Sequence, residues 1–400
     1  MAERYDVIIV GGGIIGTSIA YNLAHDGFKG KIAVFEMDPT YGHSTTALSN
    51  AGIREQFSTE INNKISMYAL DILEKFEEEM AVDGEPAHID FKRTGYLFIA
   101  TNENQMAILR KNHALQKGLG AKVELLKGKE ILGIIPDCYI GDIAGASFGK
   151  RDGHLDPWGF LQAYIKKGKS LGVKYIYDEV TNIMVENGRI AGVKTRHGDK
   201  FSSPIVVDAA GPWSGGVARM AGVDLPVVPL RRMMFIFKAH RKFNYIFPLI
   251  IDGIGVVFRN ETSEQFHASR TKEDELPGFN FSVDYDFFNN VIWPEVAHRI
   301  PVLETLKLIR GYAGAYDANT IDSNAIIGKH PEISGFYLAS GFSGHGIQQA
   351  PAVGKGISEF IRIGKYETTD LSPLRFERFK FNELVIEESF LYEGLKKEKG

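Results

Sequence analysis

The stretch 5–36, YDVIIVGGGIIGTSIAYNLAHDGFKGKIAVFE, decides the fold of this chain. Residues 5–10 are mostly apolar and β-branched, which is typical of a strand buried in a parallel sheet. Three glycines follow this strand directly: Gly11, Gly13 and Gly16. A helix is predicted over 17–24, and a second buried strand over 31–36 ends in an acid, Glu36. The stretch is therefore a complete βαβ unit of the kind that binds dinucleotides.

The chemistry of this unit indicates a dinucleotide without a 2′-phosphate. The first glycine permits a tight turn, the second lets the backbone approach a pyrophosphate, and the third allows the helix to pack closely. The first N–H groups of the helix then face the phosphates. Glu36 can accept hydrogen bonds from both hydroxyls of an adenosine ribose, and an acid at this position disfavours NADP. FAD or NAD is the expected ligand.

The composition is that of an ordinary globular protein. The chain has 400 residues, 44% of them hydrophobic, and 46 basic against 50 acidic residues leave a net charge of −4. This length favours two intimately connected domains. The basic residues are dispersed, which argues against a nucleic-acid partner.

The single cysteine, Cys138, permits no disulfide within the chain and no cysteine cluster for a metal. We therefore expect a cytoplasmic protein without a metal site. Because the first strand starts near Arg4, we also expect no signal or transit peptide.

Two further turns of small residues follow predicted strands. DAAGPW at 208–213 closes the buried strand 205–209, and GFSGHG at 341–346 lies between a strand at 335–339 and a helix at 347–363. Small side chains let a ligand approach the backbone. Three glycines at the start of a helix form a site for an anion or a carbonyl oxygen.

Two other kinds of site do not match their patterns. Ser343 does not lie in a nucleophile elbow, because His345 stands where the GxSxG pattern requires a glycine. The stretch 317–322 lacks the central glycine and the terminal glutamate of a calcium loop. Hydrolase chemistry and a calcium site are therefore not expected.

The pattern changes between the two dinucleotide-like ends of the chain. Further helices are predicted at 59–80, 103–119, 156–171, 284–300 and 376–395. Short strands are predicted over 173–207, with an Asn187-Gly188 hairpin turn, and longer antiparallel strands at 226–237, 245–251 and 255–259. An antiparallel insertion between two dinucleotide-like ends implies interleaved domains.

Together, these motifs resemble the D-amino-acid-oxidase-like flavoprotein superfamily, which includes sarcosine oxidase, dimethylglycine dehydrogenase, glycine oxidase and proline dehydrogenase β subunits. The resemblance spans nearly the whole chain. It rests on GGGIIG with Glu36, HSTTALSNAG at 43–52, DAAGPW, Arg310-Gly311-Tyr312 with Asp322, and GFSGHG. Within the superfamily, the chain is most similar to the branch called FAD-dependent oxidoreductase domain-containing protein 1, through ALSNAGIREQFS at 47–58, GFSGHGIQQAP at 341–351 and DLSP at 370–373.

The resemblance implies that FAD lies extended across the first domain, with its isoalloxazine ring at the interface with the antiparallel domain. N–H groups at the start of the helix 347–363 would stabilise the negative charge of a reduced flavin. The residues that the resemblance assigns to FAD are Gly11, Gly13, Ile15, Gly16, Glu36, Met37, Ser44, Thr45, Thr46, Ser49, Asn50, Ala51, Gly52, Val180, Ala210, Gly211, Trp213, Gly314, Gly341, Gly344, His345, Gly346, Ile347 and Gln348.

FAD is expected to bind without a covalent bond. Relatives that attach FAD through a cysteine have it near Tyr316, where this chain has Gly314-Ala315, and the attaching histidine of others falls at 48–50, which reads LSN here. His43 is the one outside candidate for attachment.

The resemblance also implies an amino-acid substrate. Arg54 corresponds to the arginine that binds the substrate carboxylate, and Tyr316, His345 and Gln348 would shape the pocket. A hydride would leave the carbon next to nitrogen for flavin N5 and give an imine that water hydrolyses. Gln348 replaces a lysine of sarcosine oxidases, and 266–267 lacks the lysine that activates oxygen, which favours a dehydrogenase over an oxidase.

We therefore predict an α/β fold: a Rossmann-like FAD-binding domain at 1–85, 145–225 and 312–400, interleaved with an α+β substrate domain, built on an antiparallel sheet, at 86–144 and 226–311. The predicted activity is oxidation of a small secondary or N-methyl amino acid such as sarcosine, dimethylglycine or proline. The alternatives are a 2-hydroxy-acid dehydrogenase, and a flavin-containing subunit or assembly factor with little activity alone. The electron acceptor would be a quinone, an electron-transfer protein or oxygen, and the chain would form a homo- or hetero-oligomer.

Overall fold

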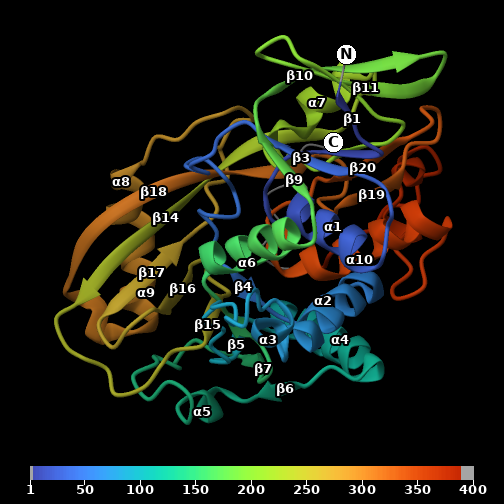
Figure 1. Cartoon of the computed structure of the whole chain (residues 1–400). Helices are drawn as coiled ribbons and strands as arrows, with labels where there is room; N and C mark the ends of the chain where they lie inside the picture. The colour runs from blue at the N-terminus through green and yellow to red at the C-terminus, as the bar shows by residue number, and fades with distance from the viewer. Residues whose placement is uncertain (1–2, 389–400) are drawn as a thin grey trace.

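The computed structural model describes residues 3–388, which are arranged around two large sheets (Figure 1). The first sheet has six strands in the order β19-β20-β13-β2-β3-β9. These strands are β2 (Val7–Val10), β3 (Ile32–Glu36), β9 (Lys174–Tyr177), β13 (Val206–Asp208), β19 (Ile326–Lys329) and β20 (Phe336–Ser340). Neighbouring strands are parallel except for the edge strand β19, which is antiparallel to β20. The predicted parallel dinucleotide sheet is confirmed.

Both faces of this sheet are covered, which explains its continuous apolar strands. Val7 and Ile9 pack against the helices on one face, and Ile8 and Val10 pack against the elements on the other. The helices of the first face are α1 (Ile14–His25), α2 (Glu60–Leu73), α6 (Pro157–Ser170) and α10 (Gly346–Ile363). The second face carries α7 (Ser214–Met220) and a small sheet of β1 (Glu3–Arg4), β10 (Val180–Glu186), β11 (Arg189–Thr195) and β12 (Lys200–Ser202).

The second large sheet has eight strands in the order β18-β14-β17-β16-β15-β5-β7-β6. Its strands are β5 (Tyr96–Ala100), β6 (Val123–Leu126), β7 (Gly145–Gly149), β14 (Val227–Ala239), β15 (Leu249–Asp252), β16 (Val257–Asn260), β17 (Gln265–Ser269) and β18 (Leu306–Asn319). All of these pairs are antiparallel except β5 with β15. Phe235 and Phe237 on β14 pack with Phe288 and Val296 of the helical segment 285–299, which covers one face of the sheet. The alternate residues of β14 therefore lie on the opposite face.

The remaining elements are one long helix, α4, and several short ones. They are β4 (Gly52–Ile53), β8 (Gly153–His154), α3 (Phe76–Glu79), α4 (Glu103–Leu119), α5 (Gly128–Ile131), α8 (Tyr285–Phe287), the π-helix η2 (Phe288–Ile292), α9 (Trp293–Arg299) and the 3-10 helices η1 (Gly211–Trp213), η3 (Pro301–Glu304), η4 (Ser372–Leu374) and η5 (Phe376–Phe379). β18 runs across the predicted domain limit at 311/312. The eight-stranded sheet therefore contains residues of the predicted substrate domain and of the predicted FAD-binding domain. The helix predicted at 103–119 is confirmed in full as α4.

The helix predicted over 59–80 is confirmed as two helices, α2 and α3, with a break at 74–75 that was not predicted. α2 ends at Leu73, and the chain turns at Lys75 before α3 begins. The turn directs Phe76 into the core, where its ring centre lies 4.9 Å from that of Phe160 and 5.3 Å from that of Tyr164. Burial of this aromatic ring on α6 outweighs continuation of the helix.

The helix predicted over 376–395 is wrong within the described residues. Only the single turn η5 forms, and 380–388 has no regular structure. Polar groups of this segment bind Asp322 instead of forming helical hydrogen bonds. Arg378 forms an ion pair with Asp322, and Asp322 Oδ2 also accepts a hydrogen bond from Val385 N at 3.2 Å. The predicted part from 389 onward lies outside the described residues.

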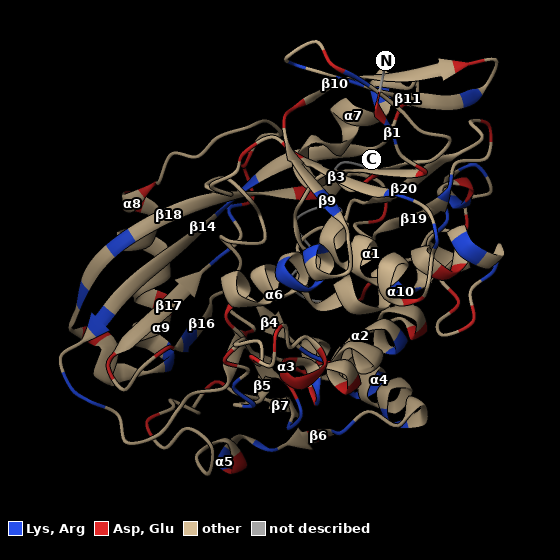
Figure 2. Ribbon diagram, in the orientation of Figure 1, with Lys and Arg blue, Asp and Glu red and all other residues tan. Residues whose placement is uncertain are grey.

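Acidic and basic side chains are interspersed over both parts of the molecule (Figure 2). Over residues 3–388, no helix combines the length and apolar character that a membrane crossing requires. The same residues contain no group of three or more His, Cys, Asp or Glu side chains arranged to hold a metal ion.

Candidate active site

A cavity of about 410 Å³ runs from the carboxyl ends of the six-stranded sheet to the open face of the eight-stranded sheet. All residues predicted to bind the cofactor or to act in catalysis line it, except Gly16 and Gly341. A Cβ at Gly16 would lie 1.9 Å from Gly11 O, and one at Gly341 would lie 3.1 Å from Val227 Cγ2. These two glycines allow close packing behind the cavity wall.

The first end of the cavity is formed by β2, β3 and the start of α1. Gly11 has φ +107°, and a Cβ there would lie 2.3 Å from Ala209 O, so the backbone itself forms the wall. α1 begins at Ile14, and its N-cap residue, Gly13, provides no side-chain cap. Its first N–H groups and the positive end of its dipole therefore face the cavity, as an anion site requires.

Glu36 is positioned at this end by backbone donors. Its Oε2 accepts from Gly12 N and its Oε1 from Asp38 N, both at 2.9 Å. Burial raises the pKa of Glu36, and these two N–H groups act in the opposite direction. Each carboxylate oxygen keeps a lone pair for a further donor, as expected for an acid that binds two ribose hydroxyls.

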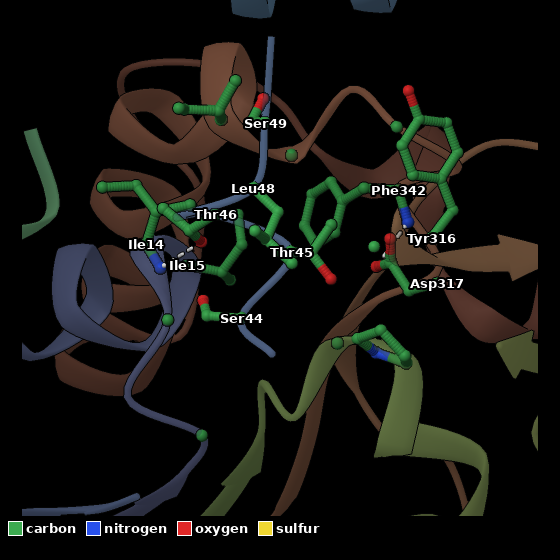
Figure 3. Close-up of a pocket in the computed structure, with 18 of the residues that line it drawn as sticks. Ile14, Ile15, Ser44, Thr45, Thr46, Leu48, Ser49, Tyr316, Asp317 and Phe342 are labelled. Atoms are coloured by element: carbon green, nitrogen blue, oxygen red, sulfur yellow. Dashed lines mark hydrogen bonds between the residues drawn. The ribbon is translucent and has the colours of Figure 1, made fainter. Parts of the chain in front are cut away.

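The loop 43–52 lies along the middle of the cavity and contacts both halves of the molecule (Figure 3). Thr46 Oγ1 accepts from Ile14 N at 3.2 Å, and Thr45 Oγ1 donates to Ala315 O on β18 at 2.6 Å. Asn50 Oδ1 accepts from Arg259 Nε at 3.1 Å. The loop thus forms the part of the cavity wall between the dinucleotide end and the eight-stranded sheet.

The GFSGHG turn is held by Asp317, which the sequence indicated only within the rejected calcium loop. Asp317 Oδ2 accepts from Phe342 N at 2.9 Å (Figure 3), and Asp317 O accepts from Ser343 N at 3.1 Å. Burial raises the pKa of Asp317 to about 6. The turn leads into α10, whose N-cap residue His345 provides no side-chain cap, so a second helix N-terminus faces the same cavity.

Arg54, His345 and Gln348 meet at the substrate end of the cavity. Arg54 Nη2 lies 3.2 Å from His345 Nε2, and Arg54 N donates to Gln348 Oε1 at 3.1 Å. Burial and the neighbouring guanidinium hold the pKa of His345 well below its usual range. His345 is therefore neutral and accepts from Arg54 through Nε2.

Aromatic rings surround the guanidinium of Arg54. Its central carbon lies 4.3 Å from the ring centre of Phe57, 5.4 Å from that of Tyr96 and 5.7 Å from that of Phe98. Among residues 3–388, no carboxylate forms an ion pair with Arg54. A cation held in this way is available to an anionic ligand.

A buried acid fixes the chain directly after Arg54. Asp152 accepts from Glu55 N at 3.0 Å and from Gln56 Nε2 at 2.9 Å, and burial raises its pKa to about 7. Sequence reasoning missed Asp152, and it also missed Tyr96 and Arg232 on the cavity wall. The sequence offers only the alternation of apolar and polar residues along a predicted strand for these positions. That alternation does not show which face of the strand lines a cavity.

Comparisons with known proteins support this picture. Residues 6–360 match the family model described as DAO, FAD dependent oxidoreductase. The FAD-dependent oxidoreductase domain-containing protein 1 of Bos taurus is 37% identical over 97% of this chain and 87% of its own length. The mitochondrial sarcosine dehydrogenase of Homo sapiens is 26% identical over 90% of this chain and 40% of its own length.

Among solved structures, L-proline dehydrogenase from P. horikoshii is 30% identical and superposes with a TM-score of 0.87. The match covers 96% of this chain and 100% of that one. Sequence and fold thus agree over nearly the whole length, and the chain belongs to the DAO family of FAD-dependent oxidoreductases.

Proposed function

We propose that this protein oxidises the C–N bond of a small secondary or N-methyl amino acid, and that it is a dehydrogenase rather than an oxidase. The observation that supports the proposal best is Arg54, a cavity-lining arginine that has no carboxylate partner among residues 3–388 and lies beside the N-terminus of α10. Relatives named sarcosine dehydrogenase and L-proline dehydrogenase act on amino acids of this class.

The cavity fits FAD on two grounds. At Gly11 the backbone itself forms the cavity wall, because a Cβ there would collide with Ala209 O. The helix α1 starts three residues later, and its N-cap residue provides no side-chain cap. Glu36 offers two carboxylate oxygens at the end of β3. In the proposal, the start of α1 binds the diphosphate, Glu36 binds the ribose, and the loop 43–52 and the GFSGHG turn hold the ring. Binding is non-covalent.

Arg54 binds and orients the substrate. Its guanidinium fork would hold the substrate carboxylate through two N–H donors, and the rings of Phe57, Tyr96 and Phe98 exclude water from that contact. Neutral His345 fixes the orientation of the fork by accepting one N–H. Bound FAD supplies the hydride acceptor, and the protein positions the carbon next to nitrogen against it.

The test is an absorbance spectrum of the purified holoenzyme during anaerobic addition of sarcosine, dimethylglycine, glycine, L-proline and 2-hydroxyglutarate. Bleaching of the flavin band by an amine supports the proposal. Slow return of the colour in air supports a dehydrogenase that passes electrons to a quinone or an electron-transfer protein. Bleaching by 2-hydroxyglutarate alone favours the hydroxy-acid alternative, which Arg54 would serve equally well.

A stable spectrum with every compound would refute the amine proposal and favour a subunit that needs a partner. Arg54→Gln should raise the KM for the active amine by about 100-fold, because a bidentate charged contact contributes about 3 kcal/mol. Arg110→Gln, at an exposed position on α4, is the matched control and should leave the KM unchanged.

A further inference from the structure

Arg232 is a second arginine of the cavity whose charge no acid balances. It lines the cavity from β14 and is partly buried. Its Nη1 donates to Arg231 O at 2.9 Å, and its central guanidinium carbon lies 5.2 Å from the ring centre of Tyr316. Within residues 3–388 it forms no ion pair. Its remaining N–H donors are available to the cavity.

Two other arginines differ in this respect: Arg231, which precedes Arg232 on β14, and Arg270, which also lines the cavity. Arg231 pairs with Glu275 at 2.8 Å, and Arg270 pairs with Glu295 at 2.8 Å. An acidic partner thus balances the charge of each of these two arginines, whereas Arg232 has none within residues 3–388. Leaving Arg232 without one costs desolvation free energy unless an anionic ligand offsets it.

Tyr316 connects Arg232 to Arg54. The Tyr316 ring packs on Gly344, where a Cβ would lie only 2.3 Å from the ring, and the next residue, His345, contacts Arg54 at 3.2 Å. On the sheet, Arg232 pairs opposite Gly314, two residues before Tyr316, so these three residues share the cavity face. The Tyr316 ring and the GFSGHG turn thus lie between the guanidinium groups of Arg54 and Arg232 along the cavity wall.

The acids of the cavity lie elsewhere. Glu36 and Asp38 follow β3, and Asp178 and Glu179 follow β9, the strand next to β3, so all four lie at the dinucleotide end. Asp317 is the exception, but its Oδ2 accepts from a backbone N–H and burial raises its pKa to about 6. The substrate end therefore combines two arginines that form no ion pair within residues 3–388 with one cavity-lining acid, Asp317, whose carboxylate is taken up by the GFSGHG turn.

We propose that the substrate carries a second carboxylate, which Arg232 binds while Arg54 binds the first. This inference rests on the proposed function, in which Arg54 holds the carboxylate of the amino acid. A planar guanidinium fork matches a carboxylate with two parallel N–H donors, which a lysine cannot reproduce. The substrate class is then a secondary or N-substituted amino acid with an acidic side chain, and Arg232 determines that specificity.

The experiment measures carboxylate binding to the oxidised holoenzyme through the change in flavin absorbance. Acetate is the probe with one carboxylate, and malonate, succinate and glutarate are the probes with two. The dicarboxylate of matching length should bind at least about ten-fold more tightly than acetate, because it gains one charged bidentate contact. Arg232→Gln should remove this preference without changing the Kd for acetate, and Arg232→Lys should restore only part of it.

The matched control is Arg310→Gln. Arg310 lies over Tyr312 on the same sheet, at 5.7 Å from the ring centre, but it does not line the cavity. This variant should keep the full preference for the dicarboxylate. An equal loss in Arg310→Gln and Arg232→Gln would mean that general surface charge is responsible, and would overturn the proposal.

Two further outcomes would also overturn it. If Arg232→Gln lowers the FAD content of the purified protein, Arg232 contacts the cofactor rather than the substrate. If no dicarboxylate binds more tightly than acetate, the second site does not exist. The proposed function fails by a different result: Arg54→Gln would leave acetate binding unchanged, whatever Arg232→Gln does.

Discussion

Replacement of Asp208 by asparagine should stabilise the protein more strongly as the pH rises. Asp208 ends β13 and is completely buried. Its Oδ1 accepts from Ala210 N at 3.1 Å, whereas its Oδ2 has no hydrogen-bond partner among residues 3–388. Burial raises the pKa of this carboxyl from 3.8 to about 7. The folded protein therefore loses stability when this group ionises.

The sign and the size of this pH dependence of stability follow from proton linkage. The unfolded chain releases this proton near pH 4 and the folded chain near pH 7, so stability falls as the pH rises through that window. Between pH 5 and pH 8, the two pKa values correspond to a loss of about 2.5 kcal/mol. The amide of Asp208→Asn carries no charge, keeps an acceptor for Ala210 N and can donate to Ser214 Oγ, which also lacks a partner.

The assay is urea unfolding of wild type and Asp208→Asn at pH 5 and pH 8 with saturating FAD, followed by flavin and tryptophan fluorescence. The stability advantage of the variant should grow by about 2.5 kcal/mol between the two pH values. Asp199→Asn, in the exposed turn between β11 and β12, is the matched control and should show no such growth. The same difference at both pH values, within about 0.5 kcal/mol, would refute the reasoning.

Three further predictions concern other parts of the structure. Glu387→Ala should lower the free energy of unfolding by about 1–3 kcal/mol, because the Glu387 carboxylate accepts from four donors around the N-terminus of α2. Glu383→Gln, in an exposed ion pair, is the control and should lower the free energy of unfolding by less than about 0.5 kcal/mol. Equal effects of the two substitutions would contradict this prediction. Gly11→Ala should abolish FAD binding, measured as flavin content, since its Cβ would lie 2.3 Å from a backbone oxygen; Gly27→Ala, at φ +84° with open space around it, should retain FAD. The Kd of acetate should rise from pH 6 to pH 8, because Asp152, whose pKa burial raises to about 7, gains negative charge near Arg54 while His345 stays neutral; a constant Kd over this range would contradict it.

The fold was predictable where local signals agree with one another. The strand at 5–10, its glycines and the acid at 36 each predict the same βαβ unit, and the structure confirms it as β2, α1 and β3. The helix at 103–119 was predictable to the residue, because Asn102 caps its start and Gly120 ends it with φ +92°. Such local information needs no knowledge of distant contacts.

The failures occur where a distant contact decides the local structure. The turn at Lys75 exists because the Phe76 ring packs on α6, about eighty residues away, and 380–388 is held by Asp322 and Asn324 rather than by helical hydrogen bonds. Arg232 failed to stand out for the same reason. Its position opposite Gly314 depends on the register of two strands that are distant in the sequence, which sequence periodicity does not report.

The charge distribution of the cavity connects binding with chemistry. Two helix N-termini, at Gly13 and His345, and two unpaired arginines, Arg54 and Arg232, all direct positive potential into one cavity. In the proposed function, that potential would stabilise both a carboxylate substrate and the negative charge of a reduced flavin. Because the same groups would act on both, removal of Arg54 should weaken acetate binding, removal of Arg232 should weaken only the preference for a dicarboxylate, and either change should lower the reduction potential of the bound flavin. The proposed function therefore predicts that substrate affinity and the reduction potential of the flavin change together when these residues are replaced.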